Sequence, residues 1–317
     1  MDIDDDLNSE IEDTIEYIVT EDMADIRIDK YLSVVNPDFT RSYIQKLIKD
    51  QKVMVNNRLI KSSFKIKNGQ AILLNIPKPI MLKIEPEDLS IDIIYEDNDI
   101  ILINKEKGMV VHPSKGHKNH TLVNALLHHC KGELSRLNGD YRPGIVHRLD
   151  KDTTGIMVAC KNDNSLKFIG KQFEKQIITR HYQAIVFNTY NEISGRVEAP
   201  IGRNPKNRTR MAINEENGKH AVTNYKVLET LGHKYSHIQC SLETGRTHQI
   251  RVHMASINHP LLGDTIYGPK KQPFSLDGQV LHASRLGFVH PRTKKYMEFQ
   301  APLPDYFNKL LDKLRKS

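Results

Sequence analysis

The residues with the clearest potential for chemistry are Arg148 and Asp150, which flank Leu149 and precede an apolar run at residues 156–160. In extended chain, residues i and i+2 share a face, so Arg148 and Asp150 should point the same way and Leu149 inward. An opposite charge within about 4 to 6 Å lowers the pKa of a carboxylate by roughly 1 to 3 units, whereas burial raises it. The pair therefore indicates a carboxylate kept ionised where water is scarce, although a purely structural ion pair would show the same pattern.

A second group lies around Arg246. Gly245 permits a tight turn, and Thr247 is in place to cap a helix. Free N–H groups at a helix start attract anions, so Arg246 would meet a phosphate or a carboxylate there. His248 and His253 are five residues apart, which is the wrong spacing for a helical His-x-x-x-His zinc site.

Two further features precede this group in the chain. Tyr182 opens a predicted strand at residues 183–187, where a tyrosine is usually half-buried packing. The stretch from residue 195 to 211 is rich in turns and basic side chains, as a loop that binds a phosphate backbone would be, although a solvated hairpin fits equally well. Its basic residues are Arg196, Arg203, Lys206, Arg208 and Arg210.

Charge is distributed unevenly along the 317 residues. Residues 1–26 hold 11 of the 39 Asp and Glu and no Lys or Arg, so the remaining chain has 46 basic against 28 acidic residues, a net charge of +18. A body this basic favours a polyanionic partner, because Lys and Arg replace the counterions on phosphates. The acidic start predicts a disordered tail over residues 1–16.

The chain is long enough for two domains. Residues 17–76 predict two helices followed by short strands, the second helix capped by Thr40 and presenting Arg41 and Lys46 on a basic face. Three prolines predict a stiff connector over residues 77–88. In residues 89–317, strands and helices alternate irregularly, which predicts an α+β fold.

The cysteines and the hydropathy indicate the compartment. Cys130, Cys160 and Cys240 lie far apart, which argues against a zinc ribbon or a disulfide framework and favours a reducing environment. The chain has no apolar run that could cross a bilayer and does not start like a signal peptide. We therefore expect a cytoplasmic protein without a membrane partner.

The whole string from Gly144 to Gly155, Gly-Ile-Val-His-Arg-Leu-Asp-Lys-Asp-Thr-Thr-Gly, resembles the signature of the RluA family of pseudouridine synthases. Asp150 stands at the family's catalytic aspartate, and Thr154 stands where serine is more frequent. The resemblance covers about residues 17–306. Other matching strings are Val110-Val-His-Pro113, Thr121-Leu-Val-Asn-Ala-Leu-Leu-His-His-Cys130, Arg180-His-Tyr182, Leu242-Glu-Thr-Gly-Arg-Thr-His-Gln-Ile-Arg-Val-His-Met254, Leu281-His-Ala-Ser-Arg285 and Pro302-Leu-Pro304.

The leading domain resembles the S4 RNA-binding domain in Arg27-Ile-Asp-Lys-Tyr-Leu32 and Val53-Met-Val-Asn56, but Gln51-Lys52 and Asn57 stand where that family commonly has glycine. An S4-like domain before the synthase domain is the arrangement of the ribosomal large-subunit pseudouridine synthase D type. The resemblance implies a mixed, largely antiparallel sheet with a central cleft. It also implies an isomerase that acts on 23S ribosomal RNA without a cofactor or metal.

The resemblance assigns roles to the candidate residues. Asp150 would be catalytic, either attacking C1′ as a nucleophile or removing the 2′ proton as a base. Arg148 and Arg246 would keep it charged and orient RNA phosphates, and Tyr182 would lie against the displaced uracil. The residues expected to bind RNA elsewhere are Arg41, Lys46, Arg203, Arg208 and Arg210.

Two other functions stay open at this stage. One is an RNA-binding ribosome-assembly factor that has lost catalysis, against which the intact candidate set argues. The other is a hydrolase or nuclease, for which Asp152 is the candidate second acid. The expected partner is ribosomal RNA within a pre-ribosomal particle, and the protein is expected to be a monomer.

Overall fold

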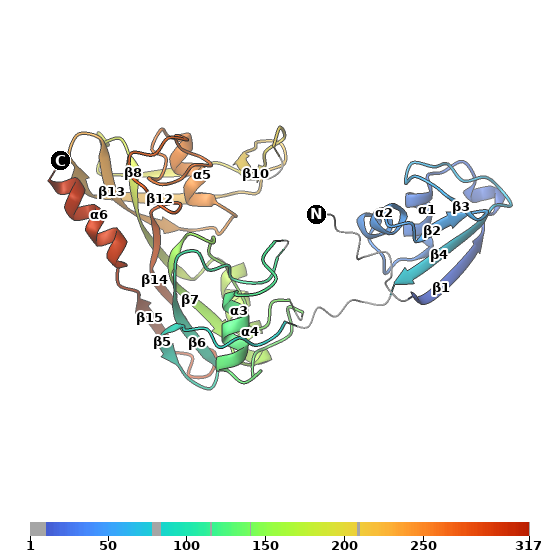
Figure 1. Ribbon diagram of the computed structural model, residues 1–317, viewed down its shortest axis with the longest axis horizontal. Coiled ribbons are helices and arrows are strands. Elements are labelled where there is room, and N and C mark those ends of the chain that lie inside the picture. Colours follow the sequence, from blue (N-terminus) through green and yellow to red (C-terminus); the bar gives the residue numbers. More distant parts are fainter. Residues whose placement is uncertain (1–10, 78–83, 115, 140, 208–209, 317) are drawn as a thin grey trace. The chain divides into compact units, whose positions relative to one another are not determined.

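The computed structural model describes residues 11–77, 84–114, 116–139, 141–207 and 210–316 (Figure 1). It divides into two compact units, with the division between residues 81 and 82. Within the described ranges, no helix has both the length and the apolar character needed to cross a membrane.

The leading unit is a four-stranded antiparallel sheet combined with two helices. The strand order is β1 (Ile11–Ile18), β4 (Ala71–Pro77), β2 (Val53–Val55) and β3 (Arg58–Leu59). A short 3-10 turn, Glu21–Met23, precedes helices α1 (Ile28–Val35) and α2 (Arg41–Lys49). The predicted cap of the second helix is confirmed, because the Thr40 side chain accepts a hydrogen bond from the Tyr43 N–H at 3.3 Å.

Both ends of this unit correct the predictions. Strand β1 begins at residue 11 and pairs with β4, so the predicted disordered tail is wrong for residues 11–16, and residues 1–10 lie outside the described ranges. The predicted connector is shorter than residues 77–88, because Pro77 ends β4. Within the second unit, the Glu85 carbonyl accepts a hydrogen bond from the Asn124 side-chain amide at 2.7 Å, and the Glu87 N–H donates to the Asn124 carbonyl at 3.0 Å.

The second unit contains a nine-stranded sheet. Its pairs are antiparallel except β7 with β14, so the mixed, largely antiparallel sheet is confirmed. The order is β5 (Asp92–Glu96), β6 (Ile100–Lys105), β7 (Thr154–Cys160), β14 (Leu281–Val289), β8 (Thr179–Phe187), β13 (Tyr235–Leu242), β12 (Val222–Leu231) and β9 (Ser194–Glu198), with β15 (Tyr296–Gln300) also on β14. Strands β10 (Ile201–Arg203) and β11 (Met211–Ile213) form a separate pair.

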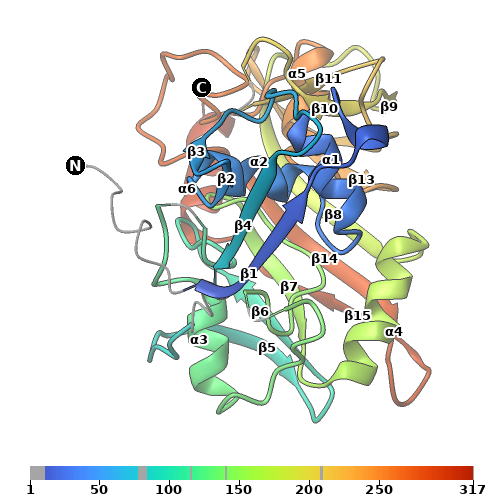
Figure 2. The same cartoon turned by 90° about the vertical axis from the view of Figure 1, so that its right-hand side faces the viewer.

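In the described part of this unit, four helices cover the sheet (Figures 1 and 2). They are α3 (Leu122–His129), α4 (Asp163–Glu174), α5 (Gln249–Ser256) and α6 (Asp305–Arg315). Side chains alternate between the faces of a strand. Along β8, Ala184 and Val186 pack with α5 and Ile185 packs with α6, so these two helices lie on opposite faces.

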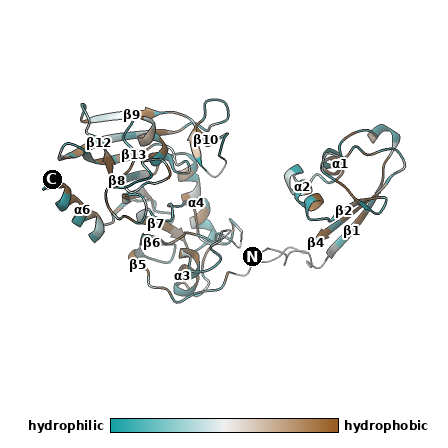
Figure 3. Cartoon of the chain, turned by 45° about the horizontal axis from the view of Figure 1, so that its top comes forward, coloured by the Kyte–Doolittle hydropathy of each residue, from teal (hydrophilic) through white to brown (hydrophobic). Residues whose placement is uncertain are grey.

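Helix α6 buries its apolar face against one side of the sheet. Phe307, Leu310, Leu311 and Leu314 recur at helical spacing and are buried against Ile185 and its neighbours. The other positions of α6 are mostly polar, so hydrophobic and hydrophilic residues alternate along it (Figure 3). The face of β8 that carries Ala184 and Val186 remains for α5 and the candidate site.

Candidate active site

Asp150 lies in the turn that leads into β7, a strand whose seven residues are all buried. The Thr153 N–H donates to the Asp150 carbonyl at 3.1 Å, which closes the turn.

Lys105, at the end of β6, connects the Asp150 turn to the loop that follows β6, and its side chain is buried, with the residue 2% exposed. Its Nζ donates to the carbonyls of Glu106, Met109 and Lys151 at 2.7, 2.9 and 3.0 Å. Burial lowers the pKa of Lys105 to about 8, although the charges of Asp152 and Asp150 oppose this.

Leu149 and His147, which precede Asp150, pack into the interior. Leu149 is 5% exposed, which confirms that it points inward. His147 accepts a hydrogen bond from the Val158 N–H at 3.1 Å and stacks on Phe173 with 4.6 Å between ring centroids. Burial, with the nearby charge of Arg180, lowers the pKa of His147 to about 3. His147 is therefore neutral at physiological pH and fastens the turn to the sheet.

Asp150 forms its closest ion pair with Arg251 of α5. The Arg251 Nη1 lies 3.0 Å from Oδ2 of Asp150, and Arg251 also donates to both oxygens of Asp264 at 2.6 and 3.0 Å. The Arg251 side chain is 5% exposed and that of Asp264 is fully buried. Burial opposes the charge, but Asp264 and Asp150 outweigh it and raise the pKa of Arg251. The guanidinium is therefore permanently charged beside both carboxyl groups.

The prediction that Arg148 and Arg246 form ion pairs with Asp150 is wrong. Within the described ranges, Asp150 pairs with Arg251 and, at 3.7 Å, with His248, and with neither Arg148 nor Arg246. Arg148 is exposed, and the Nε of Arg246 donates to the His220 carbonyl at 3.0 Å. The i and i+2 argument failed because the chain at Asp150 turns instead of running as a strand.

The start of α5 also differs from the prediction. The residue before the helix is His248, not Thr247, and it adopts φ 56° and ψ 22° without a side-chain capping bond. The side-chain oxygen of Gln249 instead accepts hydrogen bonds from Arg246 N–H and the Thr244 hydroxyl at 2.9 and 2.7 Å. This arrangement directs His248 and, one turn later, Arg251 toward Asp150.

Two cavities meet at Asp150. The larger, of about 330 Å³, also includes His117, Asp152 and Asp264 in its walls. The smaller, of about 60 Å³, includes Tyr182 and Arg246. The residues Arg148, Leu149, Asp150, His248 and Arg251 line both cavities. Asp150, Arg148, Tyr182 and Arg246 therefore all line the smaller cavity, although neither arginine forms the predicted ion pair with Asp150.

Tyr182, on β8, lines the smaller cavity. It lies on the same face of the strand as Ala184 and Val186 and packs beside them. Burial raises the pKa of Tyr182, while the charge of Arg180 opposes the shift. The Tyr182 hydroxyl is therefore protonated at neutral pH. The aromatic ring of Tyr182 lines the same cavity as Asp150.

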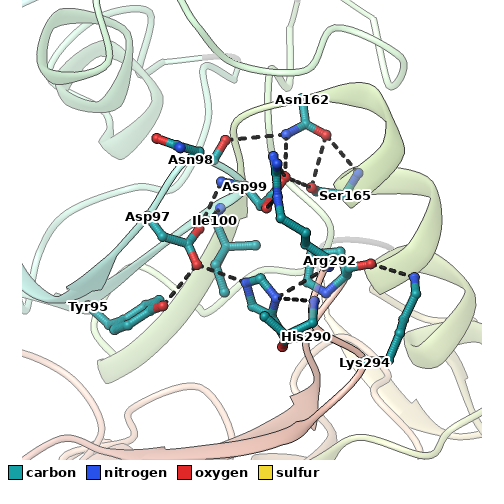
Figure 4. Close-up of polar contacts among 12 residues, drawn as sticks. Tyr95, Asp97, Asn98, Asp99, Ile100, Asn162, Ser165, His290, Arg292 and Lys294 are labelled. Atoms are coloured by element: carbon teal, nitrogen blue, oxygen red, sulfur yellow. Dashed lines mark hydrogen bonds and ion pairs between the residues drawn. The ribbon is translucent and has the colours of Figure 1, made fainter.

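A different cluster has the composition of a metal site. One ligand atom each of Asp97, Asp99 and His290 lies within 4.8 Å of the others. These atoms already have partners (Figure 4): Asp97 accepts from Tyr95 and faces His290 at 2.8 Å. Arg292 binds Asp99 and lowers the pKa of Asp99 to about 2. The cluster is best described as a hydrogen-bonded junction between loops.

The residues predicted to bind RNA lie in different settings. Arg41 donates to Asp29 at 3.1 and 3.2 Å, so it has a structural partner, whereas Lys46 is exposed on α2. Arg203 is exposed at the end of β10, and Arg210 precedes β11 and is partly exposed. Arg208 lies outside the described residues.

Three site residues had not been predicted: Lys105, His248 and Arg251. A sequence signal existed for Arg251, because it stands between Ile250 and Val252 in a helix, and a buried arginine requires carboxylate partners. His248 and Arg251 are three residues apart, which places them on one face of a helix or its first turn. The burial of Lys105 follows only from the pairing of β6 with β7, which local sequence does not show.

Comparisons with known proteins agree with this architecture. A family model described as RNA pseudouridylate synthase matches residues 99–256, and an S4 domain model matches residues 26–72. The chain is 44% identical over 303 residues to the uncharacterised RNA pseudouridine synthase YlyB of Bacillus subtilis, covering 96% of this chain and 99% of that protein. It is 42% identical over 301 residues to ribosomal large subunit pseudouridine synthase D of Zymomonas mobilis, covering 92% and 94% respectively.

The fold is also found among solved structures. The human RNA pseudouridylate synthase domain containing 1 has a TM-score of 0.56 and 23% identity, covering 76% of this chain and 98% of that chain. An S4 unit followed by this sheet and site defines an RNA-modifying isomerase. The chain belongs to the RNA pseudouridine synthases.

Proposed function

We propose that this synthase converts particular uridines of large-subunit (23S) ribosomal RNA to pseudouridine, with Asp150 as its catalytic carboxylate. The similarity to ribosomal large subunit pseudouridine synthase D over nearly the whole chain supports the choice of RNA. The observation that carries the catalytic assignment is that Asp150 stands where two cavities meet, with one oxygen held by Arg251.

The reaction defines what the site has to supply. The N1–C1′ bond breaks, the freed base turns, and a C5–C1′ bond forms, without oxidation and without added atoms. A stacked base has no room to turn, so the target nucleotide must first leave its helix at a cost of a few kcal/mol. The basic body of the protein compensates through contacts with RNA phosphates.

Asp150 begins the chemistry with Oδ1. Arg251 occupies Oδ2, while the Nε2 of His248 lies 3.7 Å from Oδ1, beyond hydrogen-bond distance. Oδ1 is therefore available to attack C1′ or to take the 2′ proton. Both routes require the ribose to enter beside Asp150, and both leave Arg251 to hold the carboxyl group.

Tyr182, Arg148 and Arg246 act on the nucleotide. Tyr182 stacks its ring on the displaced uracil, and its hydroxyl accepts the C5 proton while passing its own proton to water. N1 takes up a proton from water, so the product keeps the atoms of uridine. Arg148 is exposed at the rim of both cavities, and Arg246 lines the smaller one, where each meets RNA phosphate. The predicted pre-ribosomal setting, cytoplasmic location and monomeric state stay predictions.

The experiment is conversion of unmodified large-subunit ribosomal RNA by the wild type and by Asp150→Asn. Pseudouridine is detected as uridine that becomes reactive to carbodiimide without a change of mass. We expect conversion by the wild type, none by Asp150→Asn, and wild-type conversion by Asp88→Asn, whose carboxylate is 89% exposed. Conversion by Asp150→Asn at the wild-type rate would contradict the assignment, and cleavage of the RNA would favour a nuclease.

The inactive assembly factor is the remaining alternative. The described geometry gives it no support, because the candidate carboxylate, tyrosine and arginines line shared cavities. RNA binding without conversion of any uridine by the wild type is the result that would favour it.

A further inference from the structure

His248 has a backbone conformation that residues with a Cβ rarely adopt. Its φ of 56° and ψ of 22° are left-handed, and no side-chain capping bond explains them. Such conformations persist where the surroundings hold them in place, and they concentrate at functional sites. Here the conformation places the imidazole between Tyr267 and Asp150.

Tyr267 holds one side of the imidazole. Its hydroxyl is 2.7 Å from Nδ1 of His248 and accepts the Met211 N–H at 2.9 Å. Tyr267 is fixed in turn by Asp264, whose Oδ1 accepts the Tyr267 N–H at 3.1 Å. Because Asp264 also binds Arg251, one buried carboxylate positions both neighbours of Asp150.

The hydrogen bonds favour one position of the imidazole proton. The Tyr267 oxygen accepts from Met211, so its own proton is free to be donated to Nδ1. The imidazole proton is then on Nε2, which faces Oδ1 of Asp150 at 3.7 Å. The opposite tautomer would direct the Nε2 lone pair at a carboxylate oxygen, which is unfavourable.

His248 supplies this N–H without adding a charge. Burial lowers the pKa of His248; among its neighbours, Asp150 and Asp264 favour its protonation, and Arg251 and Arg148 oppose it. The side chains of His248 and Asp150 are 21% and 17% exposed, so both are largely buried.

We propose that His248 is a positioning residue for Asp150, an inference that rests on the proposed function. Arg251 contacts only Oδ2, which leaves the carboxyl group free to rotate about that contact. With His248 on the side of Oδ1, the rotation is restricted and Oδ1 is aimed at the ribose. The 3.7 Å separation shortens when RNA fills the cavities, as catalytic hydrogen bonds commonly do.

The hydrogen bonds that hold His248 extend to strand β11 near the surface of the protein. Met211 is the first residue of β11, and β11 pairs with β10, which carries Arg203. The hydrogen bonds therefore run from Met211 through Tyr267 and His248 to Asp150. Loss of the Tyr267 hydroxyl should make the His248 side chain less fixed in position without changing any group that contacts RNA or Asp150 directly.

Three variants separate positioning from folding. His248→Gly removes the imidazole but adopts the left-handed conformation without strain. His248→Gln restores an N–H donor, and Tyr267→Phe removes only the hydroxyl. The control is His233→Leu, which changes an exposed histidine in the turn between β12 and β13.

The measurements are the single-turnover rate with saturating enzyme, the affinity for large-subunit ribosomal RNA, and the melting temperature. We expect His248→Gly to melt no lower than wild type and bind RNA as tightly, but to react about 100-fold more slowly, the effect of a misplacement of about 1 Å. His248→Gln should recover part of the rate, Tyr267→Phe should show a smaller loss, and the control should match wild type.

A wild-type rate for His248→Gly would overturn the positioning role while leaving the proposed function intact. A variant that binds RNA more weakly and regains the wild-type rate once the enzyme is saturating would also overturn it, because His248 would then bind RNA. Failure of the wild type to convert this RNA would overturn the proposed function itself.

Discussion

The Nη1 of Arg251 lies 3.0 Å from Oδ2 of Asp150, although 101 residues separate the two in the chain. The same guanidinium is bound through its other nitrogens to Asp264. Two carboxyl groups therefore share one buried cation. Asp264 fixes the position of Arg251, and Arg251 fixes Asp150 at the edge of the cavities.

Replacing Arg251 with methionine should destabilise the protein strongly. Asp264 is fully buried, and removing one partner of a buried ion pair costs about 3 to 5 kcal/mol because the other charge is left without compensation. The free energy of unfolding, measured in urea, tests this. The control Arg315→Met breaks a half-exposed pair with Glu229 and should lower the free energy of unfolding far less.

A second variant distinguishes stability from catalysis. Arg251→Met combined with Asp264→Leu removes both buried charges and should recover much of the lost stability. It should remain slow in converting uridine, because Asp150 still lacks its partner. Equal costs for Arg251→Met and Arg315→Met would mean that the buried pair does not stabilise the fold.

Asp29 should make the leading unit sensitive to acid. Its side chain is fully buried, and although burial raises the pKa, hydrogen bonds from Arg27, Gln45 and Arg41 lower it to about 2 from an ordinary 3.8. Above pH 3.8 the full stabilisation is present. As the pH falls from 3.8 toward 2, the unfolded chain takes up a proton that the folded chain does not, so stability is lost.

Asp29→Asn should lower the stability of this unit by about 2 kcal/mol at neutral pH, since charged hydrogen bonds are lost. Hydrogen exchange of peptides from residues 28–49 measures it locally, and urea unfolding at several pH values measures its acid dependence. The difference between wild type and variant should shrink below pH 3.8. The exposed Asp38→Asn should show neither effect.

The sequence predicts elements best where the signal is local. The second helix of the leading domain, α2, was predicted with Thr40 as its cap, and both the helix and the cap are confirmed. The apolar run at residues 156–160 lies within β7, because a continuous apolar run needs burial on both faces. Asp150 and Tyr182 were placed at one site through motif resemblance, and the cavities bring them together.

The errors concern contacts between distant segments. Acidic residues at the start predict disorder, yet β1 is held by backbone pairing with β4, about which side-chain charge says nothing. Arg246 and Arg251 carry the same group on neighbouring turns, and the actual start of α5 decides which one faces Asp150. The prediction placed the cap one residue early, at Thr247, and named Arg246 instead of Arg251.

Removing residues 1–81 should weaken RNA binding and reduce its dependence on salt. Each phosphate that the shortened protein no longer neutralises lowers the slope of log affinity against log salt by about 0.7 on single-stranded RNA. Affinity for ribosomal RNA measured over a series of salt concentrations gives the slope. Removing residues 1–10 alone takes away acidic residues and no basic ones, so it should not weaken binding. An unchanged slope in the larger deletion would mean that the leading unit serves another purpose.

Tyr182 should contribute separately through its ring and its hydroxyl. Tyr182→Phe keeps the ring beside Asp150, so RNA binding should stay near wild type while the conversion rate falls about 100-fold, the lower range for a positioned proton-transfer group. Tyr182→Leu loses the ring as well, so it should also bind the RNA more weakly. Single-turnover rates and affinities for the same RNA separate the two effects.

The matched control for these two variants is Tyr235, which is partly buried against Phe187 and Phe274 and packs with α6 on the opposite side of the sheet. Tyr235→Phe removes a hydroxyl from the same domain at a distance from the cavities and should leave the rate unchanged. If Tyr182→Phe also keeps the wild-type rate, the hydroxyl takes no part in proton transfer, and Tyr182 acts only as a surface on which the uracil stacks.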